Sequence, residues 1–246
     1  MMYQDEQLKS GLEALKIDYT DDMLQKLHQY YEMMVEKNQV MNLTSITEYD
    51  DVVVKHWLDS LCFAKVYLDR CKSLQNPRLI DIGTGAGFPG IPIKIFFPEI
   101  EVVLLDSLNK RIVFLQDVVE KLELTSISCV HSRAEELANK SEYRETFDFA
   151  VSRAVARLVS LSELCIPFIK RGGLFLPYKS ESSEEEIRES SFAIKTLGCK
   201  ISKTLDYTIP TSDLPRKIVV IEKVTNTLPK YPRGGGKPMK APLLQK

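Results

Sequence analysis

The sequence predicts an α/β fold: a mostly parallel β-sheet covered by helices on both faces, ending in an antiparallel hairpin and preceded by a helical extension. After residue 76, short apolar runs alternate with helical patterns, which is typical of βαβ units in a parallel sheet. The last two apolar runs are separated only by Pro210–Pro215. This segment is too short for a crossover helix, so the two runs are expected to pair antiparallel.

Residues 1–72 are expected to form a helical extension packed on the main domain. A second helix is expected to be capped by Asp21 or Asp22, and a third spans 50–68. The segment Asn42–Ser45 lies between these two and is too short and polar for an element of its own. The first helix is indicated by apolar residues at helical spacing, namely Leu8, Leu12 and Leu15.

Residues 73–228 are expected to form the main domain, and residues 229–246 a basic tail rich in Pro and Gly that is irregular or mobile. Parallel strands are expected at 78–82, 102–105, 127–131, 147–151 and 173–178. Helices are expected at 89–97, 109–122, 134–138, 156–170 and 184–197, before the hairpin strands 200–209 and 216–224.

The charge balance excludes a protein that coats nucleic acid with its whole surface. The chain has 33 Lys and Arg against 34 Asp and Glu, whereas such a protein is strongly basic. A nucleic-acid site must therefore be a local patch. Residues 223–246 carry six bases and no acid, so this end is the better candidate to contact a polyanion.

The cysteines and histidines predict neither disulfides nor a metal centre. The five cysteines include no CxxC pair, and none of the three histidines lies near a Cys at ligand spacing, so a reducing cytoplasm is the expected compartment. The chain shows no signal peptide and no apolar run of a membrane span's length, so no membrane contact is expected. The cysteines are Cys62, Cys71, Cys129, Cys165 and Cys199.

A glycine loop is the strongest local signal. The strand ending in Asp81-Ile82 runs into the loop 83–90, which contains four glycines. Glycine permits positive φ and lets a ligand approach the backbone closely. Asp106 ends the next strand, 23 residues after Gly83, about where an acid reads the ribose of an adenosine cofactor. The alternative is a tight strand–helix turn beside a solvated Asp106.

The loop has two registers that favour different cofactors. Gly85-x-Gly87-x-x-Gly90 matches the NAD or FAD pattern. Gly83-x-Gly85-x-Gly87 instead follows Asp81, and a carboxylate there suits S-adenosylmethionine, which carries an ammonium and a sulfonium, better than a pyrophosphate. The terminal hairpin also favours the methyltransferase variant of the fold. These residues alone leave both cofactors open.

Six motifs occur in order: Asn42-Leu43-Thr44, His56-x-Leu58-Asp59-Ser60, Asp81 to Pro92, Leu105 to Arg111, Arg133-Ala134-Glu135 and Ser152-Arg153-Ala154. Together they resemble the RsmG (GidB) family of bacterial methyltransferases, which modify guanine N7 in small-subunit (16S) ribosomal RNA, over about residues 38–180. The resemblance implies a Rossmann-like, class I S-adenosylmethionine-dependent methyltransferase fold. Its sheet would have seven strands, the hairpin supplying the last two.

The resemblance also implies the cofactor site. Asp106 takes the ribose-reading place, and Arg153 is a cofactor contact, although from the residues alone it could instead pair with Glu135 or Asp148. The expected cofactor-binding residues are Gly83, Gly85, Gly87, Phe88, Asp106, Ser107, Ala134, Glu135 and Arg153.

Basic residues near the carboxyl ends of the parallel strands are the candidates for RNA binding. For Lys110 and Arg111 the alternative is a solvated helix start, and for the tail an ordinary solvated tail. The RNA-binding candidates are Lys110, Arg111, Arg133, Arg157, Lys230, Arg233, Lys237 and Lys240.

No residue is identified as a chemical catalyst, and Arg153, Asn42 and His56 are the positioning candidates. His56 and Asp59 lie three apart on one helical face and either brace the glycine loop, touch the nucleotide or are structural. Asn42 either hydrogen-bonds a base edge or ends the second helix.

The methylation of guanine N7 agrees with the absence of an identified catalytic residue. Guanine N7 has a free lone pair that attacks the sulfonium methyl with no proton to remove, so positioning and electrostatics suffice. Pyrimidine C5 methylation would instead need a positioned cysteine. The expected partner is 16S rRNA, the small subunit or its assembly intermediate. The alternatives are a NAD-dependent oxidoreductase and a non-catalytic RNA-binding or ribosome-assembly protein.

Overall fold

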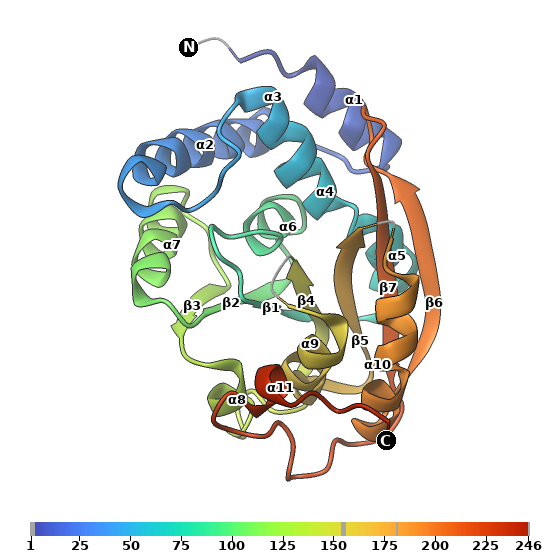
Figure 1. Cartoon of the computed structure of the whole chain (residues 1–246). Helices are drawn as coiled ribbons and strands as arrows, with labels where there is room; N and C mark the ends of the chain where they lie inside the picture. The colour runs from blue at the N-terminus through green and yellow to red at the C-terminus, as the bar shows by residue number, and fades with distance from the viewer. Residues whose placement is uncertain (1–2, 154–155, 181, 246) are drawn as a thin grey trace.

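The computed structural model describes residues 3–153, 156–180 and 182–245, so Ala154 of the sixth motif lies outside the described residues. These residues form a seven-stranded sheet in the order β3-β2-β1-β4-β5-β7-β6 (Figure 1). Strands β1 to β5 are parallel, and β7 is antiparallel to both β5 and β6. The predicted parallel sheet with its terminal hairpin is confirmed. The strands are β1 Arg78–Ile82, β2 Glu101–Asp106, β3 Ile127–His131, β4 Phe147–Arg153, β5 Ile169–Ser180, β6 Cys199–Thr208 and β7 Pro215–Lys223.

Helices cover both faces of the sheet (Figure 1). Side chains alternate along each strand, so Leu79 of β1 joins the apolar cluster under the N-terminal helices while Ile80 joins the cluster on the opposite face. The first face carries α1 Glu6–Ala14, α2 Asp21–Met41, α3 Tyr49–Val52, α4 Asp59–Leu61, α5 Ala64–Arg70, α6 Gly90–Phe96 and α7 Asn109–Lys121. The second carries α8 Ala134–Leu137, α9 Leu158–Cys165, α10 Glu184–Thr196 and α11 Lys237–Lys240.

The N-terminal helices differ from the prediction in two details. Thr20 rather than Asp21 or Asp22 caps α2, because its extended backbone lets its Oγ1 accept a hydrogen bond from the Met23 N–H at 3.3 Å. The helix predicted over 50–68 is interrupted: α3 passes into a π-helical segment, Val53–Leu58, before α4 and α5. Wide turns of this kind often occur at functional sites.

Two predictions near the C-terminal half were wrong. The helix expected over 156–170 ends at Cys165 and gives way to a 3-10 turn containing Pro167, which has no N–H to continue the helix. Strand β5 therefore begins at Ile169, earlier than expected. Most of the described tail is irregular, as predicted, and one short helix in it, α11, packs against α9.

The topology places three chain segments at one edge of the sheet. The carboxyl ends of β1, β2 and β4 lead into the glycine loop, Asp106 and Arg153. Open α/β sheets bind ligands at this edge. Of the helices described, none has the length and apolar character needed to cross a membrane.

Candidate cofactor and substrate site

The glycine loop is anchored by a residue of the N-terminal helices. Gly83, Gly85 and Gly87 have positive φ values of 71°, 62° and 110°, a conformation that favours glycine. The hydroxyl of Tyr30, a buried residue of α2, donates a hydrogen bond to the Ala86 carbonyl at 2.5 Å. The N-terminal extension therefore anchors the glycine loop through this hydrogen bond.

Asp81 is buried against this loop and hydrogen-bonds to it. Its Oδ2 accepts hydrogen bonds from Thr84 Oγ1 at 2.7 Å and from the Gly90 N–H at 2.9 Å. Its Oδ1 is buried and has no partner among the described residues. Burial raises the pKa of the Asp81 carboxyl to about 7, against the opposing effect of these hydrogen bonds. The carboxyl of Asp81 thus braces the loop, and its expected place beside a cationic ligand stays a prediction.

Asp106 ties the glycine loop to the start of α7. Its Oδ2 accepts from the Gly85 N–H at 3.0 Å and from Arg111 Nη1 at 3.2 Å, and its Oδ1 accepts from the Leu108 N–H at 2.9 Å. Arg111 therefore pairs with Asp106, while its neighbour Lys110 is exposed.

A cavity of about 380 Å³ opens above the loop. We call it the glycine-loop cavity. Its lining includes Thr44, His56, Gly83, Gly85, Phe88, Asp106, Ser107, Arg111 and Arg153. Thr44 was not among the predicted site residues, although it belongs to the motif Asn42-Leu43-Thr44.

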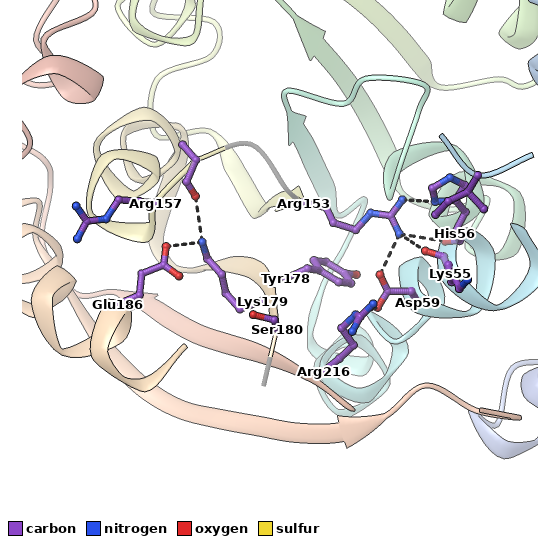
Figure 2. Close-up of a pocket in the computed structure, with 12 residues that line it drawn as sticks. Lys55, His56, Asp59, Arg153, Arg157, Tyr178, Lys179, Ser180, Glu186 and Arg216 are labelled. Atoms are coloured by element: carbon purple, nitrogen blue, oxygen red, sulfur yellow. Dashed lines mark hydrogen bonds and ion pairs between the residues drawn. The ribbon is translucent and has the colours of Figure 1, made fainter. Parts of the chain in front are cut away.

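Arg153 is the centre of a buried polar cluster (Figure 2). Its Nη1 donates to the Lys55 carbonyl and to Asp59 Oδ2, and its Nη2 donates to His56 Nδ1, each at 2.9 Å. The His56 ring is stacked on Phe88 at 4.3 Å between ring centroids. Arg153 thus pairs with Asp59, and not with Glu135 or Asp148.

The cluster determines the protonation state of His56. A guanidinium can only donate, so Nδ1 of His56 carries the lone pair and Nε2 donates to Thr44 Oγ1 at 2.9 Å. Burial and the charge of Arg153 lower the pKa of His56 to about 3. The ring is therefore neutral at physiological pH and carries no imidazolium proton.

A second cavity, of about 720 Å³, lies on the other side of Arg153 and His56. We call it the Arg153 cavity, and Figure 2 shows its wall. Its lining includes Lys55, Arg157, Lys179 and Arg216, so cations predominate over the acids Asp59 and Glu186. Arg157 is mostly exposed and pairs with Glu189. Such a rim suits an anionic ligand.

The comparisons with known proteins decide the family. The chain matches GidB, rRNA small subunit methyltransferase G, over residues 23–213. The chain belongs to this family. It is 49% identical over 236 residues to Ribosomal RNA small subunit methyltransferase G of Lachnoclostridium phytofermentans, covering 96% of each chain. Against the Staphylococcus saprophyticus relative, identity is 47% over 239 residues, covering 97% of this chain and 98% of the relative.

Two solved structures share the fold at low identity. A putative sarcosine dimethylglycine methyltransferase from Galdieria sulphuraria has a TM-score of 0.52 at 10% identity, covering 72% of this chain and 88% of that chain. The [4+2]-cyclase SpnF has a TM-score of 0.50 at 13% identity, covering 66% and 80%. Since a cyclase shares the fold, the fold alone does not determine the reaction.

GidB membership makes the chain an rRNA methyltransferase that uses S-adenosylmethionine and acts on an RNA substrate. The oxidoreductase alternative is excluded. The residues present fit the cofactor. A Cβ atom at Gly85 would have only the Gly83 carbonyl within 4.0 Å, so open space lies above the loop. The carboxylate of Asp106 borders this space.

The other predicted residues are spread over three places. Ala134 and Glu135 line a third cavity beside α8, with Arg133 at its rim. Asn42 is exposed and ends α2 in the left-handed conformation, which was the structural alternative. Arg233 is engaged by Glu163 rather than free. The remaining candidates of the tail are exposed: Lys230, Lys237 and Lys240.

The described residues contain no group of three or more His, Cys, Asp or Glu side chains placed to hold a metal ion. Further candidate site residues that the sequence did not predict lie on β5 and β7, outside the six motifs. They are Tyr178, Lys179 and Arg216, which line the Arg153 cavity.

Proposed function

We propose that the chain methylates N7 of a guanine in small-subunit ribosomal RNA, with the acceptor base in the Arg153 cavity. One observation carries the proposal: His56 and Arg153 line both this cavity and the glycine-loop cavity. A methyl group held above the glycine loop would meet a base on the other side of this pair. S-adenosylmethionine supplies that methyl as an electrophile on sulfur.

The acid–base properties of the site support N7 as the acceptor. The N7 lone pair forms the new bond to carbon while the carbon–sulfur bond breaks, so the positive charge passes to the purine and no proton moves. A neutral His56 agrees with this reaction, because it neither supplies nor needs a proton. Positioning by Arg153 and exclusion of water are then the main contributions of the protein.

A cysteine mechanism has no support in the structure. Among the residues that line the two cavities there is no cysteine. Burial raises the pKa of Cys129 to about 11 and of Cys199 to about 12, and it also raises those of Cys62 and Cys165. These thiols are therefore protonated and poor nucleophiles.

The rim of the Arg153 cavity is proposed to hold the RNA backbone. Arg157, Arg216 and Lys55 come from three separate segments and are all at least partly exposed. Cations placed around a pocket neutralise phosphates and orient the strand without reading its sequence. The acceptor guanine would be taken from an unstacked position, as RNA recognition generally requires.

The cofactor is proposed to lie along the glycine-loop cavity. Gly83, Gly85 and Phe88 would contact its methionine end, and Asp106 with Ser107 its ribose. The cavity offers both signs of charge, which matches a ligand that carries an ammonium, a sulfonium and a carboxylate. A cytoplasmic location is part of this proposal, since the proposed substrate is ribosomal RNA.

The test is methyl transfer from radiolabelled S-adenosylmethionine to small-subunit rRNA that lacks the modification, followed by nucleoside analysis. Naked RNA, partly assembled subunits and intact subunits are each offered. Label in 7-methylguanosine on any of them supports the proposal, and the preferred form identifies the partner. Label in another nucleoside contradicts the assignment of N7, and absence of label on all three with folded protein contradicts the proposed reaction.

A further inference from the structure

A third cavity continues the glycine-loop cavity on the side away from Arg153. It has a volume of about 220 Å³, and we call it the α8 cavity. The α8 cavity shares Gly83, Asp106 and Ser107 with the glycine-loop cavity. At its other end, the glycine-loop cavity shares His56 and Arg153 with the Arg153 cavity. The three cavities therefore follow one another, with Asp106 at the second junction.

The tail forms one wall of the α8 cavity. Gly236, Pro238 and Met239 line it from α11 and its start. The opposite wall comes from the main domain and is largely apolar, with Ile82 and Leu105 among its residues. Segments more than 100 residues apart in the sequence thus enclose one space.

The tail is fixed in this position by a buried acid. Glu163 of α9 is fully buried, and its Oε1 accepts hydrogen bonds from the Arg233 backbone N–H and Nε, both at 2.8 Å. Arg233 Nη2 donates to Glu163 Oε2 at 2.7 Å and to the Ala241 carbonyl at 2.8 Å. One guanidinium therefore clamps both ends of the segment 233–241.

We propose that the segment 234–241 forms the outer wall of the adenine pocket for S-adenosylmethionine, with Met239 and Pro238 against the purine. The proposal rests on this cofactor. Its methyl must lie near His56 and Arg153, and Asp106 marks the ribose, so the adenine extends past Asp106 into the α8 cavity. An apolar space closed by a polarizable thioether suits a purine ring.

The test is calorimetric titration of the full chain and of a chain ending at Arg233. The shortened chain keeps the contacts of Arg233 with Glu163 and lacks the segment 234–246. S-Adenosylmethionine, S-adenosylhomocysteine and 5′-methylthioadenosine are the ligands. The shortened chain is expected to bind all three about tenfold more weakly, because all three share the adenosine that the tail covers. Met239→Ala is expected to weaken each by about threefold.

Leu244→Ala and Lys240→Ala are the matched controls, because both side chains are exposed and neither lines the cavity. Both are expected to bind each ligand within about twofold of the unchanged chain. Equal affinities of Met239→Ala and the unchanged chain would overturn the proposal. So would a loss confined to the two ligands that carry the amino-acid end. Failure of the unchanged chain to bind S-adenosylmethionine would overturn the cofactor assignment together with the proposal. The titration of the unchanged chain therefore separates this outcome from a failure of the proposal about the tail alone.

Limited proteolysis gives a second readout that a merely structural tail would not affect. Trypsin cleaves after Lys240, which is exposed on α11. Saturating S-adenosylmethionine is expected to slow this cleavage at least threefold, since a ligand against α11 holds it closed. Cleavage after Lys203, on the exposed edge strand β6, serves as the reference. An unchanged rate at Lys240 with bound cofactor would contradict contact with α11.

Discussion

Arg153 Nη2 donates a hydrogen bond to His56 Nδ1 at 2.9 Å, which joins the end of β4 to the π-helical segment of the N-terminal extension. The two side chains form the partition between the glycine-loop cavity and the Arg153 cavity. Burial and the charge of Arg153 keep the His56 ring neutral, and the ring is stacked on Phe88, so the pair offers a fixed surface to the reacting groups without taking part in proton transfer.

The pair of Arg153 with Asp59 predicts a large loss of stability on truncation. Arg153→Ala leaves the buried Asp59 with Tyr207 at 3.3 Å and Arg216 at 3.9 Å. Removing one partner of a buried ion pair costs about 3 kcal/mol or more, which urea denaturation at pH 7 measures. Arg157→Ala is the control, because its pair with Glu189 is exposed and contributes less than about 1 kcal/mol. Equal losses in the two variants would contradict the role of Asp59.

Two buried groups with opposite shifts predict a compensation in the pH dependence of stability. The pKa of His56 is lowered to about 3 by burial and by Arg153, so the unfolded chain binds the extra proton and acid destabilises the fold below about pH 6.5. The pKa of Asp81 is raised to about 7 by burial, so the folded chain holds the extra proton and stability is lost as pH rises from about 4 to 7. Between pH 5 and 7 the two contributions oppose each other.

Single variants should separate these contributions. In the Asp81→Asn variant, the pH dependence from His56 is no longer opposed by that of Asp81. The free energy of unfolding of this variant, relative to that of the unchanged chain, should therefore rise by about 2 kcal/mol between pH 5 and 7. In the His56→Gln variant, only the pH dependence from Asp81 remains. The free energy of unfolding of this variant, on the same comparison, should fall by about 2 kcal/mol over the same pH range. Urea denaturation at pH 5, 6 and 7 provides the measurement, and His131→Gln, an exposed histidine, is the control. Parallel profiles for all four chains would contradict both shifts.

The contact of Arg111 with Asp106 predicts that both residues affect the cofactor. Asp106→Asn removes the carboxylate that accepts from Gly85 and Arg111, and it should weaken S-adenosylmethionine binding by about tenfold. Arg111→Ala should weaken it by about threefold, because the carboxylate loses its ion pair. Lys110→Ala, next in the chain but exposed, should leave the affinity unchanged. Calorimetry that finds Arg111→Ala equal to Lys110→Ala would show that Arg111 acts only on the RNA.

The parallel sheet, its terminal hairpin and the glycine loop were predictable because local physics specifies them. Alternation of apolar runs with helical patterns requires a parallel sheet, and a six-residue connection requires a hairpin. Asp106 was found from its position at the end of the second strand. The exact end of the helix before β5 was not found, because the effect of Pro167 competes with an otherwise helical pattern.

The partners of the site residues could not be predicted from sequence. The Asp59 that holds Arg153 lies 94 positions away, and the Glu163 that holds Arg233 lies 70 positions away. Such pairings depend on how α4 and the tail pack on the sheet, which no local pattern encodes. The same reason explains Arg216: beside Lys217 on a hairpin strand it belongs to no motif, and only the pairing of β7 with β5 brings it to the Arg153 cavity.

The cationic rim of the Arg153 cavity predicts a defined salt dependence of RNA binding. If Arg157 contacts one phosphate, Arg157→Ala should weaken binding of small-subunit RNA and lower the slope of log K against log salt by about 0.7 to 0.9. Arg216→Ala should do the same, and their effects on the slope should add because the two residues lie on different elements. Arg171→Ala is the control, because Arg171 is an exposed base at the opposite end of β5 from Lys179. Fluorescence anisotropy at four salt concentrations measures the slopes. A loss of slope in Arg171→Ala equal to that in Arg157→Ala would place the RNA elsewhere on the surface, whereas loss confined to the rim variants supports the Arg153 cavity as the entrance for the acceptor base.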